Sequence, residues 1–244
     1  WFTTKKNEED DWRFEVTNNY PTAIERKTAG KAKVGKPIKF ELKGIFEINY
    51  SDTTSIHWEL SGPETISRTR TKEFLFIPRQ SGTYTLTVKM NDRAFKRPVS
   101  FECITCEIVN GWWTDSDGNM LTGEDDAEEP SNTIGSAGWN QEVVAAFHHL
   151  GLNGEEVTVE VFNKDSNGST LVYTRDMKVP DTNNAASCSF PLNDAVRKEV
   201  EKSGLSSNGL LYFTVKAKDG LKLINSGLAL PKNETYLEVN DKVR

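Results

Sequence analysis

Cysteine is scarce in this chain of 244 residues, which contains three: Cys103, Cys106 and Cys188. An odd number does not make a disulfide framework, so the chain must rely on its hydrophobic cores. The spacing of Cys103 and Cys106 fits half of a zinc or redox motif, with His148 and His149 as the further ligands that it would need. We favour buried cysteines without a metal, because strand residues three apart point to opposite faces of a sheet.

Long apolar runs and basic clusters are also missing. No run approaches the roughly 18 apolar residues of a membrane-spanning helix, and hydrophobic residues make up 36% of the chain. The lysines are scattered and the formal net charge is -6, which argues against nucleic acid as the main partner. The sequence begins at Trp1 and shows no signal peptide, so we expect a mature or excised piece of a longer protein.

No catalytic motif is present. Nucleophilic catalysis needs an activated Ser or Cys with a base in reach, but the chain has three histidines and no Gly-x-Ser-x-Gly motif. The segment 135–138, with Ser136, misses that motif by one position. We therefore predict that the chain is not an enzyme and assign no catalytic residue. A glycosidase pair of carboxylates stays open, because its separation depends on the folded geometry.

What the sequence does contain is an alternation of apolar and polar residues in its first half. It is clearest over residues 56–60, centred on Trp58, and over residues 81–88, which include Gly82 and Tyr84. A period of two is typical of a strand with one buried face. A Trp centred in one strand and a Gly-x-Tyr at the start of another are how immunoglobulin-type sandwiches fill their core.

Turn signals and strand spacing predict two domains and an all-β fold class. Residues 29–105 are expected to form an Ig-like antiparallel β-sandwich, and residues 106–244 a second, larger one. Residues 1–28 would be an N-terminal extension or the end of a preceding module. The second domain is expected to carry one short helix at about 193–203, with Asn193 as its N-cap.

These residues carry a resemblance to known modules. Residues 31–101, with the core Trp58 and the Gly-x-Tyr corner at Tyr84, resemble the Ig-like and PKD-like modules of bacterial secreted and surface proteins. Residues 113–118 and 151–161 are similar to a β-sandwich repeat of Bacteroidota proteins. That repeat is associated with type VI secretion and related contractile injection loci, where it joins spike-tip or toxin domains. The resemblance implies a tandem of structural modules and offers no catalytic residues.

Three tryptophans are candidates for a binding surface. Trp112 and Trp113 are neighbours on a predicted strand, so one of them should face outward unless it is covered. Together with Trp139 in a polar loop they would form a sugar-stacking platform or a protein hot spot. Packing against the loop or a partner domain is the interpretation that we favour. The acidic residues of the same loop complete the candidate surface: Glu124, Asp125 and Asp126.

A calcium site is a second metal interpretation that the sequence offers. Asp115, Asp117 and Asn119 have the spacing of the first three ligands of a calcium loop. Gly118 comes two places too early for an EF-hand and no predicted helix flanks the segment, so we favour a hairpin turn. A looser calcium site that recruits carboxylates from the acidic loop is the alternative, because a cation would relieve their mutual repulsion.

Two adjacent histidines cannot form one site by themselves. His148 and His149 lie in a predicted strand and must point to opposite faces. His148 shares parity with Val144 and Ala146, which predicts that His148 lies inward.

Together these observations predict a non-enzymatic structural or adaptor module that spaces or presents parts of a larger bacterial secreted or surface protein. Its expected partner is another protein or an adjoining domain of the same polypeptide, with neither nucleic acid nor a membrane span involved. The expected location is secreted, cell-surface or periplasmic, and cytoplasmic before export. The alternative function is a carbohydrate-binding or adhesin module that uses exposed tryptophans, assisted by calcium.

Overall fold

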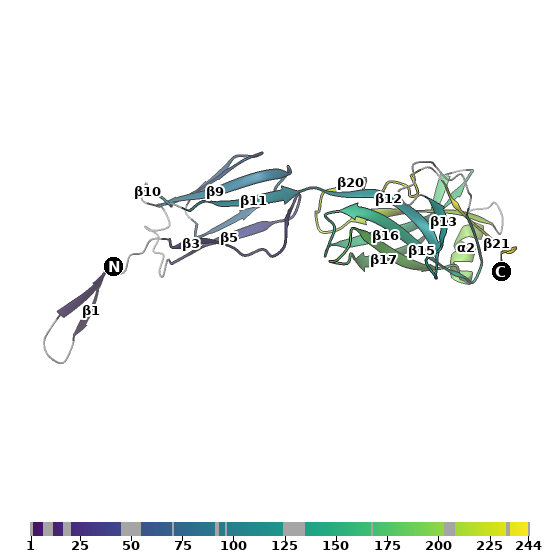
Figure 1. The fold of residues 1–244 in the computed structure, drawn as a ribbon, viewed down its shortest axis with the longest axis horizontal. Coiled ribbons are helices and arrows are strands. Elements are labelled where there is room, and N and C mark those ends of the chain that lie inside the picture. The colour runs from purple at the N-terminus through teal and green to yellow at the C-terminus, as the bar shows by residue number, and fades with distance from the viewer. Residues whose placement is uncertain are drawn as a thin grey trace. The chain divides into compact units, whose positions relative to one another are not determined.

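The chain folds into two compact units, Trp1–Ile104 and Thr105–Arg244, each of which contains a β-sandwich (Figure 1). The computed structural model describes residues 2–6, 12–16, 21–44, 55–69, 71–90, 93–95, 97–123, 135–166, 168–202, 208–232 and 235–243. Strands dominate both units and one helix occurs among these residues, so the predicted all-β class is confirmed. Within the same residues, no helix has the length and apolar character that a membrane crossing requires.

The first unit consists of short strands that form two sheets and a separate hairpin. The strands are β1 (Phe2–Lys6), β2 (Trp12–Val16), β3 (Ala23–Arg26), β4 (Ala32–Lys33), β5 (Ile38–Lys43), β6 (Ile56–Ser61), β7 (Ile66–Thr69), β8 (Glu73–Phe76), β9 (Gly82–Met90), β10 (Arg93–Ala94) and β11 (Val99–Ile104). The larger sheet has the order β4-β11-β9-β6-β7, with β10 added to β9, and the smaller sheet has the order β3-β5-β8. The hairpin pairs β1 with β2.

The first sandwich begins before residue 29. Strand β3 lies within the stretch 1–28, which the sequence assigned to an extension or a preceding module. The structure instead pairs β3 with β5 in antiparallel register, and Ile24 lies opposite Leu42. Both side chains belong to the core of this unit, so β3 is an integral strand of the smaller sheet.

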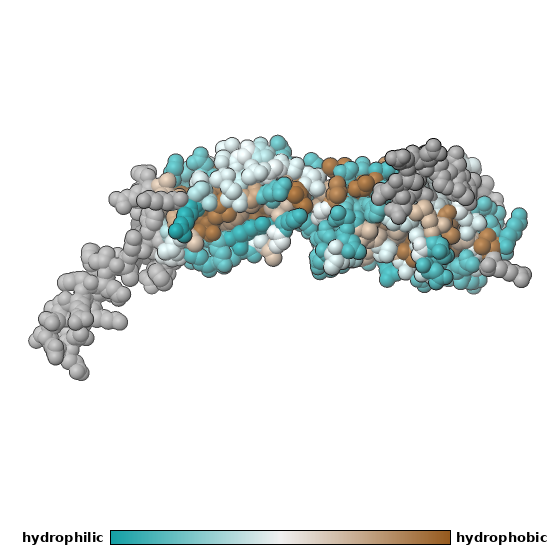
Figure 2. All heavy atoms as spheres, viewed as in Figure 1, coloured by the Kyte–Doolittle hydropathy of each residue, from teal (hydrophilic) through white to brown (hydrophobic). Residues whose placement is uncertain are grey.

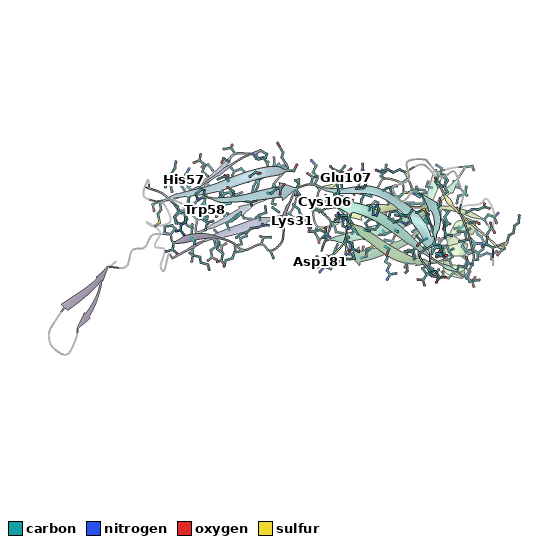
Figure 3. All side chains as sticks on the ribbon, in the orientation of Figure 1. Lys31, His57, Trp58, Cys106, Glu107 and Asp181 are labelled. Carbon is teal, nitrogen blue, oxygen red and sulfur yellow. The ribbon has the colours of Figure 1, made fainter. Side chains whose placement is uncertain are left out.

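Aromatic side chains fill the core of the first unit. Trp58 and Phe74 are fully buried, and their ring centroids are 5.5 Å apart. Figure 3 labels Trp58 among the strands of this unit. Its indole Nε1 donates a hydrogen bond to the carbonyl oxygen of Thr71 at 2.8 Å. The buried N–H group therefore keeps a partner, as the burial of a Trp requires.

Tyr84 ties the start of β9 to the preceding turn. Its hydroxyl lies 2.9 Å from the carbonyl oxygen of Gln80 and 2.8 Å from Glu64 Oε2. The contact with Gln80, four residues upstream, is the tyrosine corner of immunoglobulin-type sandwiches. Burial raises the pKa of Tyr84, and the hydrogen bond to the Glu64 carboxylate raises it further. The Gly-x-Tyr pattern in the sequence thus marks a corner that is stabilised by the hydrogen bonds of the Tyr84 hydroxyl.

The second unit also contains two sheets. Its strands are β12 (Cys106–Asp115), β13 (Met120–Gly123), β14 (Ser136–Gly138), β15 (Glu142–Leu150), β16 (Glu156–Asp165), β17 (Gly168–Lys178), β18 (Ala185–Pro191), β19 (Gly209–Ala217), β20 (Leu223–Ile224) and β21 (Leu237–Asn240). One sheet has the order β13-β12-β15-β18, with β20 added to β12. The other has the order β14-β21-β19-β16-β17.

The predicted helix of the second unit is α2 (Asp194–Lys202). Asn193 caps it, because its Oδ1 accepts hydrogen bonds from the backbone N–H groups of Ala195 and Val196, each at 3.1 Å. Val196 and Val200 are the buried residues of the helix and join the core. Local capping and spacing signals were therefore sufficient to locate this element.

The inward face of β15 differs from the predicted one. His149 is fully buried, together with Phe147 on the same face, whereas His148 is half-buried and points to the outer face. The prediction that His148 lies inward is wrong. Both faces of this strand carry apolar residues, so alternation alone did not distinguish the buried face.

The tyrosine corner leads to a prediction about stability. We expect Tyr84→Phe to lower the free energy of unfolding of the first unit by about 1–3 kcal/mol, because Glu64 and the Gln80 carbonyl lose the hydroxyl that they share. Urea unfolding followed by tryptophan fluorescence measures the change. Tyr212→Phe, on the outer face of the second unit, is the matched control and should change stability by less than about 0.5 kcal/mol. Equal effects of the two substitutions would contradict a fastening role for Tyr84.

Candidate functional site

The three candidate tryptophans are buried. Trp113 is fully inaccessible and packs in the core, with its ring centroid 5.1 Å from that of Phe213. Trp112 and Trp139 are each 9% exposed. The ring of Trp112 lies edge-on to His148 with centroids 4.6 Å apart, and the guanidinium of Arg197 lies 5.6 Å from the centre of the Trp139 ring. These side chains do not form the open platform that sugar stacking requires.

The acidic part of the candidate surface, Glu124, Asp125 and Asp126, lies outside the described residues. Its participation in binding stays a prediction.

The predicted calcium ligands form a hydrogen-bonded turn. Asp115 Oδ1 accepts hydrogen bonds from the backbone N–H groups of Asp117 (3.0 Å) and Asn119 (2.8 Å). Asp115 Oδ2 accepts a third from Asn119 Nδ2 at 2.7 Å, and Gly118 adopts a positive φ of 88°. No group of three or more His, Cys, Asp or Glu side chains that could hold a metal occurs in the described part of the chain. Calcium binding by Asp115, Asp117 and Asn119 stays a prediction, whereas the turn is observed.

A different set of side chains, one exposed and three half-buried, forms a row on the outer face of a sheet in the second unit. Val157, Val159 and Val161 of β16 are buried, so alternation places Phe162 on the outer face of its sheet. The strand register sets Leu171 of β17 on one side of Phe162 and Tyr212 of β19 on the other. Tyr236 follows next to Tyr212, with ring centroids 6.0 Å apart. We call Leu171, Phe162, Tyr212 and Tyr236 the aromatic row.

The rings of the aromatic row pack against one another. Phe162 and Tyr212 are stacked with centroids 5.2 Å apart and an angle of 14° between their planes. Leu171 at one end of the row is 46% exposed, and Leu210, which shares a strand face with Tyr212, is 41% exposed. The row is therefore an apolar ridge of rings and aliphatic groups, in which Phe162 and Tyr212 each turn one ring face toward the other.

Paired charges border the aromatic row on the same sheet face. Lys216 Nζ lies 2.7 Å from Glu160 Oε2, and Asp176 is bound by Lys218 and by Thr158 Oγ1. The contact with Lys218 holds the pKa of Asp176 below its usual value, and the Thr158 hydrogen bond acts in the same direction. These ion pairs form a charged border, and the aromatic row is the apolar part of the same face. Figure 2 shows hydrophobic atoms among hydrophilic ones on the visible side of this unit.

Sequence reasoning missed the aromatic row although a signal was present. The pairs Val161-Phe162 and Tyr212-Phe213 place large apolar residues at both parities of strands whose inner faces are already apolar. In a strand with one buried face, such an extra aromatic residue must lie on the outer face. The pattern shows that outer aromatics exist, but it does not show that the register brings them into one row.

Comparisons with known proteins add a distant structural likeness. No protein-family model matches the chain, and no curated protein matches it. Among solved structures, the chain is similar to the fibronectin(III)-like modules of CbhA from Clostridium thermocellum. The sequence identity is 10% over 89% of this chain and 93% of that chain, with a TM-score of 0.28.

The Asp115 turn leads to a pH prediction. Hydrogen bonds from the Asn119 side chain and backbone lower the pKa of Asp115 from 3.8. A carboxyl group with a lowered folded pKa stabilises the fold above its unfolded pKa, and that stability is lost as the pH falls through the folded value. We expect Asp115→Asn to unfold more easily than the wild type at pH 7, and the difference to vanish as the pH falls through the lowered pKa of Asp115. Thermal unfolding across this pH range measures it, and a difference that persists in acid would contradict the prediction.

Proposed function

We propose that this chain is a non-enzymatic structural and binding module that contacts another protein through the aromatic row of its second unit. The observation that carries the proposal is the alignment of Leu171, Phe162 and Tyr212 across adjacent strands of the outer sheet face, with Tyr236, just before β21, beside Tyr212. Aromatic side chains are enriched in protein interfaces, and clustered aromatic anchors with a polar rim are typical of binding hot spots.

The geometry favours a protein partner over a sugar. Carbohydrate stacking needs an open aromatic face, but Phe162 and Tyr212 turn a face toward each other. The alternative of a glycan-binding or adhesin module also needs exposed tryptophans, and Trp112, Trp113 and Trp139 are at most 9% exposed. A partner protein with an apolar patch can cover the apolar ridge and leave the bordering ion pairs in solvent.

The wider setting is part of the same proposal. Two sandwich units in one chain suit a spacer or adaptor within a larger bacterial secreted or surface protein. Within this proposal, the larger protein would belong to the contractile injection components with whose modules residues 113–118 and 151–161 share a resemblance. In this setting the first unit acts as a spacer within the larger protein, and the second unit presents the aromatic row to a partner.

Site-specific cross-linking tests this function. A photoreactive phenylalanine analogue in place of Tyr212 should capture a defined protein partner in extracts of the organism that encodes the chain. Phe162→Ser with Leu171→Ser should reduce the recovery of that partner by roughly thirtyfold, because hot-spot truncations cost about 2 kcal/mol or more.

A matched control uses exposed apolar residues elsewhere on the same unit. Ile224→Ser with Leu228→Ser replaces side chains that are 44% and 41% exposed and should leave the recovery unchanged. Equal recovery with both double variants, or capture of a glycan alone, would contradict the proposed function.

A further inference from the structure

The first unit has a groove between two sheet edges. Strand β7 ends the larger sheet and β8 ends the smaller one, and neither has a further neighbour among the described strands. Residues of both strands line a groove of about 580 Å³, with Ile66 and Phe76 among them. Two unpaired edges beside one groove are a ready template for an additional strand.

The backbone groups on the free edge of β8 can be identified from the register. Lys39 of β5 pairs with Leu75, but the Lys39 carbonyl accepts a hydrogen bond from Lys27 N, and Lys39 N donates to Thr28 Oγ1. Both polar groups of Lys39 thus point toward β3. In an antiparallel pair, Leu75 must then point its N–H and C=O away from β5.

The same alternation applies one step further along the chain. Ile77 lies two residues after Leu75, so its N–H and C=O also point to the free edge. The other edge residue of β8, Glu73, already uses both backbone groups on the hydroxyl of Thr71, at 2.8 and 3.2 Å. The open stretch of the edge therefore begins at Leu75.

The side chains along this open stretch are apolar and exposed. Leu75 is 49% exposed and Ile77 is 52% exposed. Soluble proteins usually protect free strand edges with lysine, proline or a bulge. Here Pro78 follows the open stretch without interrupting it, so the edge keeps its capacity to pair.

The groove carries more positive than negative charge. Arg68 and Arg79 both line it, and the guanidinium of Arg68 lies 5.6 Å from the centre of the Phe74 ring. The structure describes no salt bridge for either arginine among the residues that it places.

Among the described residues that line the groove, the one carboxylate is Glu64, and it already accepts hydrogen bonds. Glu64 Oε2 accepts a hydrogen bond from Arg79 N at 2.8 Å and lies 2.8 Å from the Tyr84 hydroxyl. Burial raises the pKa of Glu64, but these hydrogen bonds and the Arg79 charge outweigh it and leave the pKa below its usual value. Arg68, over the Phe74 ring, and Arg79, beside Glu64, are thus the positive groups that carboxylates of a partner would meet.

We propose that this edge groove binds an extended peptide segment, in which carboxylates alternate with apolar side chains, as an added strand on β8. Main-chain hydrogen bonds to Leu75 and Ile77 supply the pairing, as in other complexes formed by strand addition. The apolar side chains of the peptide cover Leu75 and Ile77, and its carboxylates meet Arg68 and Arg79. This site lies in the first unit and is independent of the aromatic row, so each can fail without the other.

Fluorescence anisotropy with a labelled twelve-residue peptide of alternating Asp and Val tests the proposal on the full chain. Three matched peptides separate the contributions: one with N-methyl groups on alternate residues, one with Lys in place of Asp, and one of Asp alone. We expect binding of the Asp-Val peptide and about tenfold weaker binding of each of the others, since strand pairing, charge and apolar contact are all needed. Equal binding of the all-Asp peptide would show a plain polyanion site and overturn the proposal.

Variants of the chain then locate the site. Leu75→Pro removes an edge N–H that no strand of the fold uses, so the sheet should persist while peptide binding weakens about tenfold. Leu75→Val keeps the N–H and should bind as the wild type does. Arg68→Glu with Arg79→Glu should abolish binding, and Lys31→Glu, beside the opposite edge of the larger sheet, should not.

Two results would overturn the assignment. One is undiminished binding by Leu75→Pro when circular dichroism shows an intact fold. The other is a dimer in sedimentation that Leu75→Pro converts to monomers, because the edge would then pair with a second copy of the chain.

Discussion

Burial of one face of every core strand is the constraint on which the rest of this structure depends. A strand can give alternate residues to a core only if the sheet that contains it packs against a second sheet. The buried valines of β16 and the buried Trp58 of β6 both meet this requirement. Because the inner faces are committed to packing, the outer faces and the edges are the surfaces left for recognition.

Features with a local cause could be predicted from the sequence. The N-cap Asn193 and the apolar spacing of Val196 and Val200 located α2, because capping and helical periodicity operate within one or two turns. The Gly-x-Tyr pattern located the corner at Tyr84, whose hydroxyl bonds to a residue four positions upstream. In both cases the partners are close in sequence, so no knowledge of the sheet order was needed.

Features that depend on how the strands pair, or on which elements cover a side chain, could not be predicted from the sequence. Strand β15 is apolar at both parities, so the burial of His149 rather than His148 follows from its pairing with β12 and β18. The sequence likewise favoured packing for the tryptophans of the second unit, but it did not identify the groups that cover them, such as Phe213 beside Trp113 and Arg197 beside Trp139. The aromatic row joins residues as distant as Phe162 and Tyr236, and only the strand order of the folded sheet makes them neighbours.

The two units offer different chemistry for recognition although both are sandwiches. A sheet face binds through side chains, so its specificity follows from the shape of a row such as Phe162 and Tyr212. A free sheet edge binds through backbone groups, so its partner must be extended and is selected by the flanking charges, here Arg68 and Arg79. A rigid protein surface suits the first kind of site and an extended segment suits the second. The two proposed sites would therefore select partners by different chemistry, side-chain shape in one unit and backbone pairing with charge in the other.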